Sequence, residues 1–229
     1  MTEYPQARFA PPPGATDVLL VRHGQSAPAR PEEPFPLVEG QGDPPLSPLG
    51  REQAAALGRR LAGAGLDAVY VTTLRRTRET AQPLLEATGL EPLLERDLRE
   101  VHLGEWEGGL FRKHVAERHP LALRMLAEER WDVIPGAESA ESFAGRVRGA
   151  LERIAAAHPG GRVAVVSHGG VIGQVLSLAT GSRPFAFAGV DNASISQVVL
   201  TGPRWVLRRF NDTAHLDEKD FSQAATPPT

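Results

Sequence analysis

The chain has no cysteine among its 229 residues. This absence excludes disulfide bonds, a thiolate nucleophile and any metal site built on cysteine ligands. No apolar run approaches the roughly 20 residues that span a bilayer. Residues 1–14 are polar and proline-rich, without the apolar centre of a signal peptide. We therefore expect a cytoplasmic protein without a membrane partner.

An excess of one charge is also missing. The 25 basic and 28 acidic residues are interspersed and leave a net charge of −3. A chain without a basic tract binds nucleic acid poorly, so we expect no nucleic-acid partner. Hydrophobic residues make up 41% of the chain, which is enough for a substantial core, and no segment repeats another. We predict a flexible leader over 1–16, a single domain over 17–215 and a frayed tail over 216–229.

Several common catalytic motifs are absent as well. The sequence contains no glycine-rich phosphate loop of the nucleotide or dinucleotide kind and no Gly-x-Ser-x-Gly nucleophile elbow. It also lacks a pair of histidines at the spacing that binds zinc on a helix. We therefore predict that the protein uses neither a metal nor a cofactor.

Two apolar stretches, 18–21 and 163–166, end in the same unusual way. The first runs into His23 and the second into His168, and a glycine follows each histidine. Both stretches read as buried strands, and the carboxyl ends of parallel strands meet at one sheet edge. One such histidine alone would favour a structural role, but two in matching contexts favour a shared site. The other five histidines are expected to be solvated or locally hydrogen-bonded: His102, His114, His119, His158 and His215.

Hydrophobic periodicity predicts alternating strands and helices. We expect strands near 17–22, 67–72, 92–94 and 163–166, and helices over 48–63, from 72 onward, in pieces of 111–129, over 138–158 and over 171–176. Residues 193–201 and 204–210 predict an antiparallel hairpin at one sheet edge. The predicted fold is α/β: a three-layer α/β/α sandwich with a mostly parallel central sheet, an antiparallel edge strand and a site at the C-terminal ends of the strands.

A proline-rich segment leaves directly from the first histidine strand. Six prolines lie between residues 27 and 45, and their fixed φ and missing N–H groups keep such a segment out of a sheet. A loop of this length in a compact domain is often functional. We expect it either to wall the site or to be a plain surface insertion.

Arginines gather where the helix after 67–72 begins. Arg75, Arg76 and Arg78 stand in its first turns, where a positive charge opposes the helix dipole. Pairing with Glu79 and Glu86 accounts for some of the three but not readily for all. We therefore expect at least one arginine to hold an anion, and the residues alone do not distinguish Arg75 from Arg76.

These pieces combine into a cationic pocket. Guanidinium groups bind phosphoryl oxygens in a bidentate way that lysine does not reproduce. A histidine among arginines stays neutral because a second positive charge is repelled, so it is available as a nucleophile. Phosphoryl transfer also needs an acid for the leaving oxygen, for which Glu100 and Glu105 are the candidates. The glycine after each histidine would let backbone amides approach the phosphate.

Four ordered motifs carry a resemblance to a known family. They are Arg22-His23-Gly24, the Thr-Thr-Leu-Arg-Arg-Thr turn at 72–77, Leu98-Arg99-Glu100 with Gly-Glu-Trp-Glu-Gly at 104–108, and Ser167-His168-Gly169-Gly170. In this order and approximate spacing, over about 17–215, the chain resembles the histidine phosphatase superfamily, which has the phosphoglycerate-mutase-like fold.

The resemblance implies a role for each motif residue. His23 would be the nucleophile that becomes phosphohistidine, with Arg22, Arg76 and His168 as the phosphate clamp. The family motif places its arginine two residues after the leucine, which selects Arg76. Glu100 would protonate the leaving group and then activate water, and we expect His168 to be a charged donor to phosphate. The predicted phosphate-binding residues are Arg22, Gly24, Ser26, Arg76, His168 and Gly169.

The resemblance also bears on the reaction. Mutases of the glycolytic branch follow Arg-His-Gly with Trp-Asn and carry Arg-Tyr-Gly after the acidic residue, whereas this chain has Gln-Ser-Ala-Pro at 25–28 and Val-His-Leu-Gly at 101–104. We therefore predict a histidine acid-type phosphatase that hydrolyses a small phosphomonoester. The alternatives are a bisphosphoglycerate-primed phosphoglycerate mutase and a catalytically silent phosphate-binding module. The natural substrate is left open, and a homodimer is compatible with the sequence.

Overall fold

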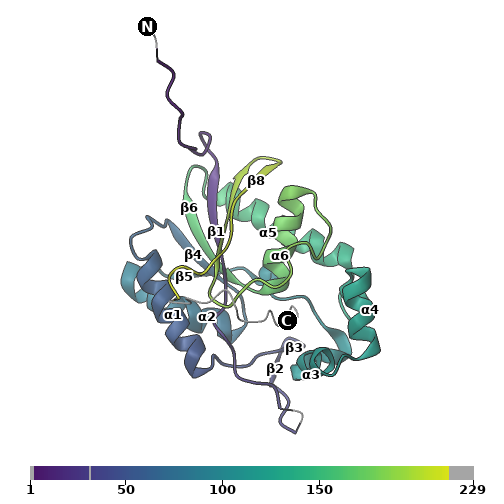
Figure 1. Cartoon of the computed structure of the whole chain (residues 1–229). Coiled ribbons are helices and arrows are strands. Elements are labelled where there is room, and N and C mark those ends of the chain that lie inside the picture. The colour runs from purple at the N-terminus through teal and green to yellow at the C-terminus, as the bar shows by residue number, and fades with distance from the viewer. Residues whose placement is uncertain (1–2, 31, 217–229) are drawn as a thin grey trace.

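A six-stranded sheet forms the centre of the computed structural model, which describes residues 3–30 and 32–216 (Figure 1). Its strand order is β5-β4-β6-β1-β7-β8. The strands are β1 (Thr16–Arg22), β4 (Ala68–Val71), β5 (Pro92–Leu94), β6 (Arg162–Ser167), β7 (Ile195–Thr201) and β8 (Arg204–Asp212). The first four in the spatial order are parallel, and β7 and β8 form an antiparallel hairpin at the edge beside β1. The predicted mostly parallel sheet with an antiparallel edge is confirmed.

Helices cover both faces of this sheet. The helices α1 (Pro48–Leu61) and α2 (Arg75–Thr88) lie on one face, and α5 (Ala140–Ala157) and α6 (Gly169–Thr180) lie on the other (Figure 1). Shorter elements stand beyond the carboxyl edge of the parallel strands: α3 (Leu110–Ala116), α4 (Pro120–Glu128) and the 3-10 turns η1 (Arg96–Leu98), η2 (Gly104–Gly109) and η3 (Trp131–Val133). The three-layer α/β/α arrangement agrees with the prediction.

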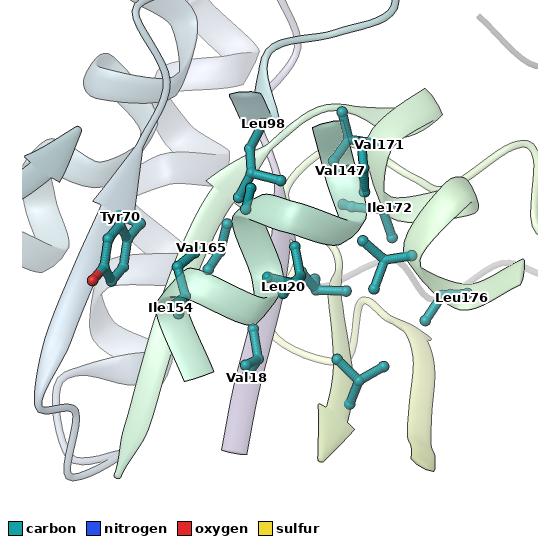
Figure 2. Close-up of a cluster of buried hydrophobic side chains, with 14 of the residues drawn as sticks. Val18, Leu20, Tyr70, Leu98, Val147, Ile154, Val165, Val171, Ile172 and Leu176 are labelled. Carbon is teal, nitrogen blue, oxygen red and sulfur yellow. The ribbon is translucent and has the colours of Figure 1, made fainter. Parts of the chain in front are cut away.

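Side-chain alternation along β1 explains the two cores. Val18 and Leu20 point to the face covered by α5 and α6, where they pack with Val165 and Ile172 (Figure 2). Leu19 and Val21 point to the other face and pack against α1 and α2. Because successive strand residues face opposite sides, a fully apolar strand fits only a sheet buried on both faces.

Strand register places the two histidines at one edge. Arg22 at the end of β1 pairs with Ser167 at the end of β6. His23 and His168 directly follow these residues, so both emerge at the carboxyl edge of the parallel strands. The helix that follows each strand begins close to the same edge, which is the position where open α/β sheets bind ligands.

Local sequence signals account for several helix boundaries. Ser47 caps α1 by accepting a hydrogen bond from Gly50 N at 3.0 Å, with proline at the next position. Ser139 caps α5 in the same way, accepting from Ser142 N at 3.2 Å. Gly89 ends α2 in the left-handed region with φ 70°.

The proline-rich segment contains a feature that was not expected. Residues 37–38 (β2, Leu37–Val38) and 41–42 (β3, Gln41–Gly42) form a small antiparallel ribbon, turned by Glu39 and Gly40 at positive φ. The expectation of a segment without sheet pairing is wrong here, because residues 37–42 contain no proline and keep their amides. The ribbon stays separate from the central sheet.

The chain ends were predicted to be a leader and a tail. Residues 3–13 form no helix or strand, and β1 begins at Thr16. The tail predicted over 216–229 falls outside the described residues after position 216. No helix described between residues 3 and 216 combines the length and apolar character needed to cross a bilayer.

Candidate active site

A pocket lies at the carboxyl edge of the parallel strands. Its charged and titratable lining consists of Arg22, His23, Arg76, Glu100, Glu107 and Arg112. Its apolar lining includes Phe35, Val101, Leu103, Trp106, Phe111 and Trp131. Phe35 and β3 belong to the segment 27–45, so this segment forms part of the wall rather than a plain surface insertion.

The backbone of His23 is held from three sides. Its amide donates to Ser167 O at 2.9 Å, which extends the β1–β6 pairing by one residue. Its carbonyl accepts hydrogen bonds from Asn192 Nδ2 at 2.8 Å and from Ala193 N at 3.3 Å. The position of the imidazole is therefore fixed by the sheet and by the segment that precedes β7.

The ring contacts of His23 determine its tautomer. Nδ1 lies 2.8 Å from Gly24 O, and a carbonyl oxygen can only accept, so Nδ1 carries the proton. Nε2 accepts a hydrogen bond from Arg76 Nε at 3.2 Å, which requires a lone pair on that nitrogen. His23 thus presents an unprotonated Nε2 beside an arginine.

Electrostatics keep this imidazole neutral. Burial lowers the pKa of His23 well below its ordinary value, and the positive charges of Arg76 and Arg22 lower it further. The hydrogen bond to the Gly24 carbonyl opposes these effects only in part. A neutral imidazole with an unprotonated nitrogen is the form that attacks an electrophile.

Of the neighbouring arginines, the structure brings Arg76 to the pocket and leaves Arg75 outside. Arg76 is buried, donates from Nη1 to Gly42 O at 2.9 Å and lies 3.9 Å from Asp43 Oδ1. Burial lowers its pKa to about 10, so it remains charged at neutral pH. Arg75 is exposed and pairs with Glu79. The sequence could not distinguish Arg75 from Arg76, and the structure does so because only Arg76 lies on the face of α2 that meets the sheet.

Arg22 joins this group from the end of β1. Its guanidinium donates to Val190 O and lines the same pocket as His23. Burial lowers the pKa of Arg22, while the carboxylate of Glu100 opposes the shift. Two arginines from different elements therefore line the pocket together with His23.

His168 lies close to His23, and its surroundings act on its charge. The centres of the His23 and His168 rings are 5.2 Å apart, and His168 Nε2 lies 3.1 Å from Thr72 Oγ1. Burial, followed by the charge of Arg76, lowers the pKa of His168 well below its ordinary value. These effects favour the neutral imidazole, and a charged His168 that donates to a bound phosphate stays a prediction. Its Nδ1 is buried and makes no hydrogen bond to the described residues.

The structure brings Glu100 to the pocket, whereas Glu105 is exposed and lies outside the lining. The Glu100 carboxylate accepts hydrogen bonds from Val101 N at 3.0 Å and from Gly170 N at 3.1 Å. Its backbone carbonyl accepts from Arg146 Nη2 at 2.8 Å. The side chain is thus aimed by its own loop and by the first turn of α6.

None of the glycines and serine of the predicted phosphate set, Gly24, Ser26 and Gly169, is among the residues that line the pocket. Gly24 N donates to Thr80 Oγ1 at 2.9 Å, and a Cβ at Gly24 would lie 2.5 Å from Gly50 O. Ser26 lines a second opening beside His23, and Gly169 lines a groove that adjoins the pocket. The expected approach of the Gly24 amide to phosphate is therefore wrong, because that amide is already engaged.

Sequence reasoning missed residues that complete the pocket. Arg112 reaches it from α3, and a charged residue on a surface-like helix gives no signal of this. Glu107 accepts from Gly42 N at 2.7 Å and from Leu103 N at 2.9 Å, and so fastens β3 to the acidic loop. The acidic pattern between glycines over 97–109 was the only sequence signal that could have indicated this contact between the acidic loop and β3.

Three of the remaining histidines make hydrogen bonds outside the pocket lining. His158 Nε2 lies 2.9 Å from Tyr70 Oη, His215 Nε2 lies 3.0 Å from Ala193 O, and His119 caps α4. Within residues 3–30 and 32–216, no group of three or more histidine or acidic side chains is arranged to hold a metal ion.

Known proteins are similar to this chain in sequence and structure. The family described as the histidine phosphatase superfamily (branch 1) matches residues 18–213. Phosphoglycerate mutase-like protein 4 of Arabidopsis thaliana is 35% identical over 215 residues, which cover 91% of this chain and 90% of the relative. The metal-independent phosphoserine phosphatase of the same plant is 34% identical, with coverage of 91% and 86%. A mycobacterial glucosyl-3-phosphoglycerate phosphatase superposes with a TM-score of 0.72 at 29% identity, over 87% of this chain and 100% of that chain.

Proposed function

Because the chain belongs to the histidine phosphatase superfamily, a family of phosphatases and mutases, we propose that it hydrolyses small phosphomonoesters through a phosphohistidine on His23. The observation that carries this proposal is the pair of ring contacts of His23. Nδ1 donates its proton in a hydrogen bond to the Gly24 carbonyl, and the unprotonated Nε2 accepts a hydrogen bond from Arg76 at the pocket.

In the first half-reaction, the Nε2 lone pair of His23 attacks phosphorus. The P–N bond forms as the P–O bond to the ester oxygen breaks, while Arg22 and Arg76 stabilise charge on the phosphoryl oxygens. Glu100, in its protonated form, gives its proton to the leaving oxygen and becomes a carboxylate. The alcohol then departs, and the phosphoryl group stays on His23.

In the second half-reaction, water replaces the alcohol. The Glu100 carboxylate takes a proton from the water as its oxygen attacks phosphorus. The P–N bond breaks, inorganic phosphate leaves, and Nε2 of His23 regains its lone pair. Glu100 is again protonated, so one cycle consumes one ester and one water and restores the enzyme.

Phosphoglycerate mutase activity is the second candidate, because several relatives are named as probable phosphoglycerate mutases or as mutase-like. A mutase must return the phosphoryl group to a bound hydroxyl before water reaches it. The chain lacks the Trp-Asn and Arg-Tyr-Gly segments that accompany the glycolytic mutases it resembles, which favours hydrolysis.

The proposal predicts hydrolysis of p-nitrophenyl phosphate in the presence of EDTA. Changing His23→Ala should lower kcat by about a thousandfold or more, because the covalent route is lost. The control His158→Gln removes a histidine that bonds to Tyr70 and lies outside the pocket lining, and it should leave kcat within about twofold. Full activity of His23→Ala would overturn the assignment of His23 as the nucleophile. Conversion of 3-phosphoglycerate to 2-phosphoglycerate with a bisphosphoglycerate primer would favour the mutase instead.

A further inference from the structure

Arg112 is a cation in the pocket that has no counter-ion among the described residues. Its Nη1 donates to Ala27 O at 2.8 Å and its Nη2 donates to Ser26 Oγ at 2.6 Å. The guanidinium carbon lies 5.4 Å from the centre of the Phe35 ring. All three partners are neutral, so the side chain is held in one orientation without having its charge balanced.

The other two pocket arginines differ in this respect. Glu100 acts electrostatically on both Arg22 and Arg76, and Asp43 lies 3.9 Å from Arg76. For Arg112, burial lowers the pKa and no neighbouring carboxylate opposes the shift. Removing a cation from water without a partner is costly, so such a charge persists where a ligand supplies the anion.

Arg112 is near the phosphate clamp but held by other elements. Its charge lowers the pKa of Arg22, Arg76 and His23, which shows that the groups repel one another. Its hydrogen bonds go to residues 26–27, whereas Arg76 contacts His23 and β3. It lines both the main pocket and the second opening beside His23.

The chemistry of the surrounding wall limits what Arg112 can bind. Phe35, Trp106 and Phe111 suit the carbon skeleton of a small ester and provide no charge. Lys113, the next cation on α3, is exposed and lies outside the pocket lining. A single guanidinium matches a monoanion, and a planar carboxylate fits its fork of N–H donors.

We infer that Arg112 binds a carboxylate of the substrate, and hence that the substrate is a small phosphate ester that also carries a carboxylate. This inference rests on the proposed function, because it assigns the phosphoryl group to His23 and the second anion to Arg112. It makes Arg112 a residue that determines specificity.

Two esters that differ at one position provide the test: 3-phosphoglycerate carries a carboxylate where glycerol 3-phosphate carries a hydroxymethyl group. The wild-type protein should have the higher kcat/KM for 3-phosphoglycerate. In Arg112→Gln, which keeps a donor but no charge, kcat/KM for 3-phosphoglycerate should fall about tenfold to a hundredfold more than that for glycerol 3-phosphate. Arg112→Lys should recover part of the preference, because it restores the charge.

The matched control is Lys113→Gln, which removes a neighbouring positive charge from the exposed side of α3. It should keep the wild-type preference between the two esters. An equal fall for both esters in Arg112→Gln would place Arg112 in the phosphoryl clamp or in a purely structural role and would overturn the inference. An unchanged preference would overturn it as well.

A binding measurement separates this inference from the proposed function. Calorimetry with His23→Ala, compared with His23→Ala combined with Arg112→Gln, reports the affinity for each ester without turnover. If the wild-type protein hydrolyses no ester, the proposed function fails, while a carboxylate preference that depends on Arg112 still supports the subsite. If hydrolysis occurs but binding shows no such preference, only the subsite fails.

Discussion

At the scale of single residues, the character of His23 comes from its neighbours. His23 and His168 are both buried, and the pKa of each is lowered by burial and by Arg76. They differ in their contacts: Nδ1 of His23 faces a carbonyl, whereas Nε2 of His168 faces the Thr72 hydroxyl. Only His23 therefore has a tautomer fixed by an obligatory acceptor, with its other nitrogen at the pocket.

The charge of Arg76 predicts a measurable titration shift. In Arg76→Met the pKa of His23 should rise toward its ordinary value, because the largest charge effect on the imidazole is removed while its burial remains. NMR titration of the 15N-labelled imidazole measures this shift directly. Arg75→Met, which removes an exposed arginine from the same turn, serves as the control. An unchanged His23 pKa in Arg76→Met would contradict the electrostatic explanation.

Prediction from sequence succeeded at residues whose position follows from strand ends. His23 and His168 belong to this class, because an apolar strand followed by histidine and glycine fixes where the side chain emerges. Arg75 and Arg76 could not be separated from the residues alone, since adjacent helix positions differ only in which one faces the sheet. The presence of Arg112 in the pocket could not be predicted, because it depends on how α3 packs against residues 26–27.

At the scale of elements, the first turn of α6 and the loop after η1 align Glu100. Gly170 N donates to its carboxylate at 3.1 Å, and a Cβ at Gly170 would lie 2.4 Å from Oε1. Together with the amide of Val101, this contact fixes the direction of the Glu100 carboxyl group. Glycine at 170 is required by this approach.

Adding one methyl group here should disturb catalysis more than folding. In Gly170→Ala the Glu100 carboxylate must move, and kcat for p-nitrophenyl phosphate should fall about a hundredfold, the scale of losing a positioned acid. Vanadate binding, which reports the arginine clamp, should change by less than about threefold. The control is Gly145→Ala on α5, where an added Cβ meets no atom within 4 Å. Equal losses of kcat and vanadate affinity would show that Gly170 supports the whole pocket instead.

The segment 27–45 illustrates what local sequence could not predict about elements. Its prolines correctly indicated exclusion from the central sheet. Its position depends on partners far along the chain, because Glu39 pairs with Arg96 and Arg99 and Gly42 bonds to Glu107. Such polar contacts have no periodicity, so the composition alone left a wall and a plain insertion equally open.

At the scale of the whole molecule, the buried neutral histidines link stability to pH. The pKa values of His23 and His168 are lower in the folded protein than the value of about 6.5 expected when the chain is unfolded. Below that pH both histidines bind protons in the unfolded chain but stay neutral in the folded protein. The free energy of unfolding is therefore unaffected by these two histidines above pH ~6.5 and decreases as the pH falls below that value.

Urea unfolding at several pH values between 5 and 7 tests this linkage. Each of the two histidines should lower the free energy of unfolding by up to about 1.4 kcal/mol per pH unit below pH ~6.5. His23→Gln should show a slope that is smaller by about one histidine's share, whatever its stability at pH 7. A profile that is flat between pH 5 and 7 in the wild-type protein would refute the linkage.

The attachment of His23 has a consequence for the order in which the protein becomes functional. The carbonyl of His23 is held by Asn192, 169 positions later in the chain, and its amide is held by Ser167. During synthesis the histidine emerges early, yet its anchors are made only after most of the chain has left the ribosome. Contacts this distant in sequence form late because closing long loops is slow. An aligned nucleophile therefore signals a completed fold, and partly made chains should be inert toward phosphate esters.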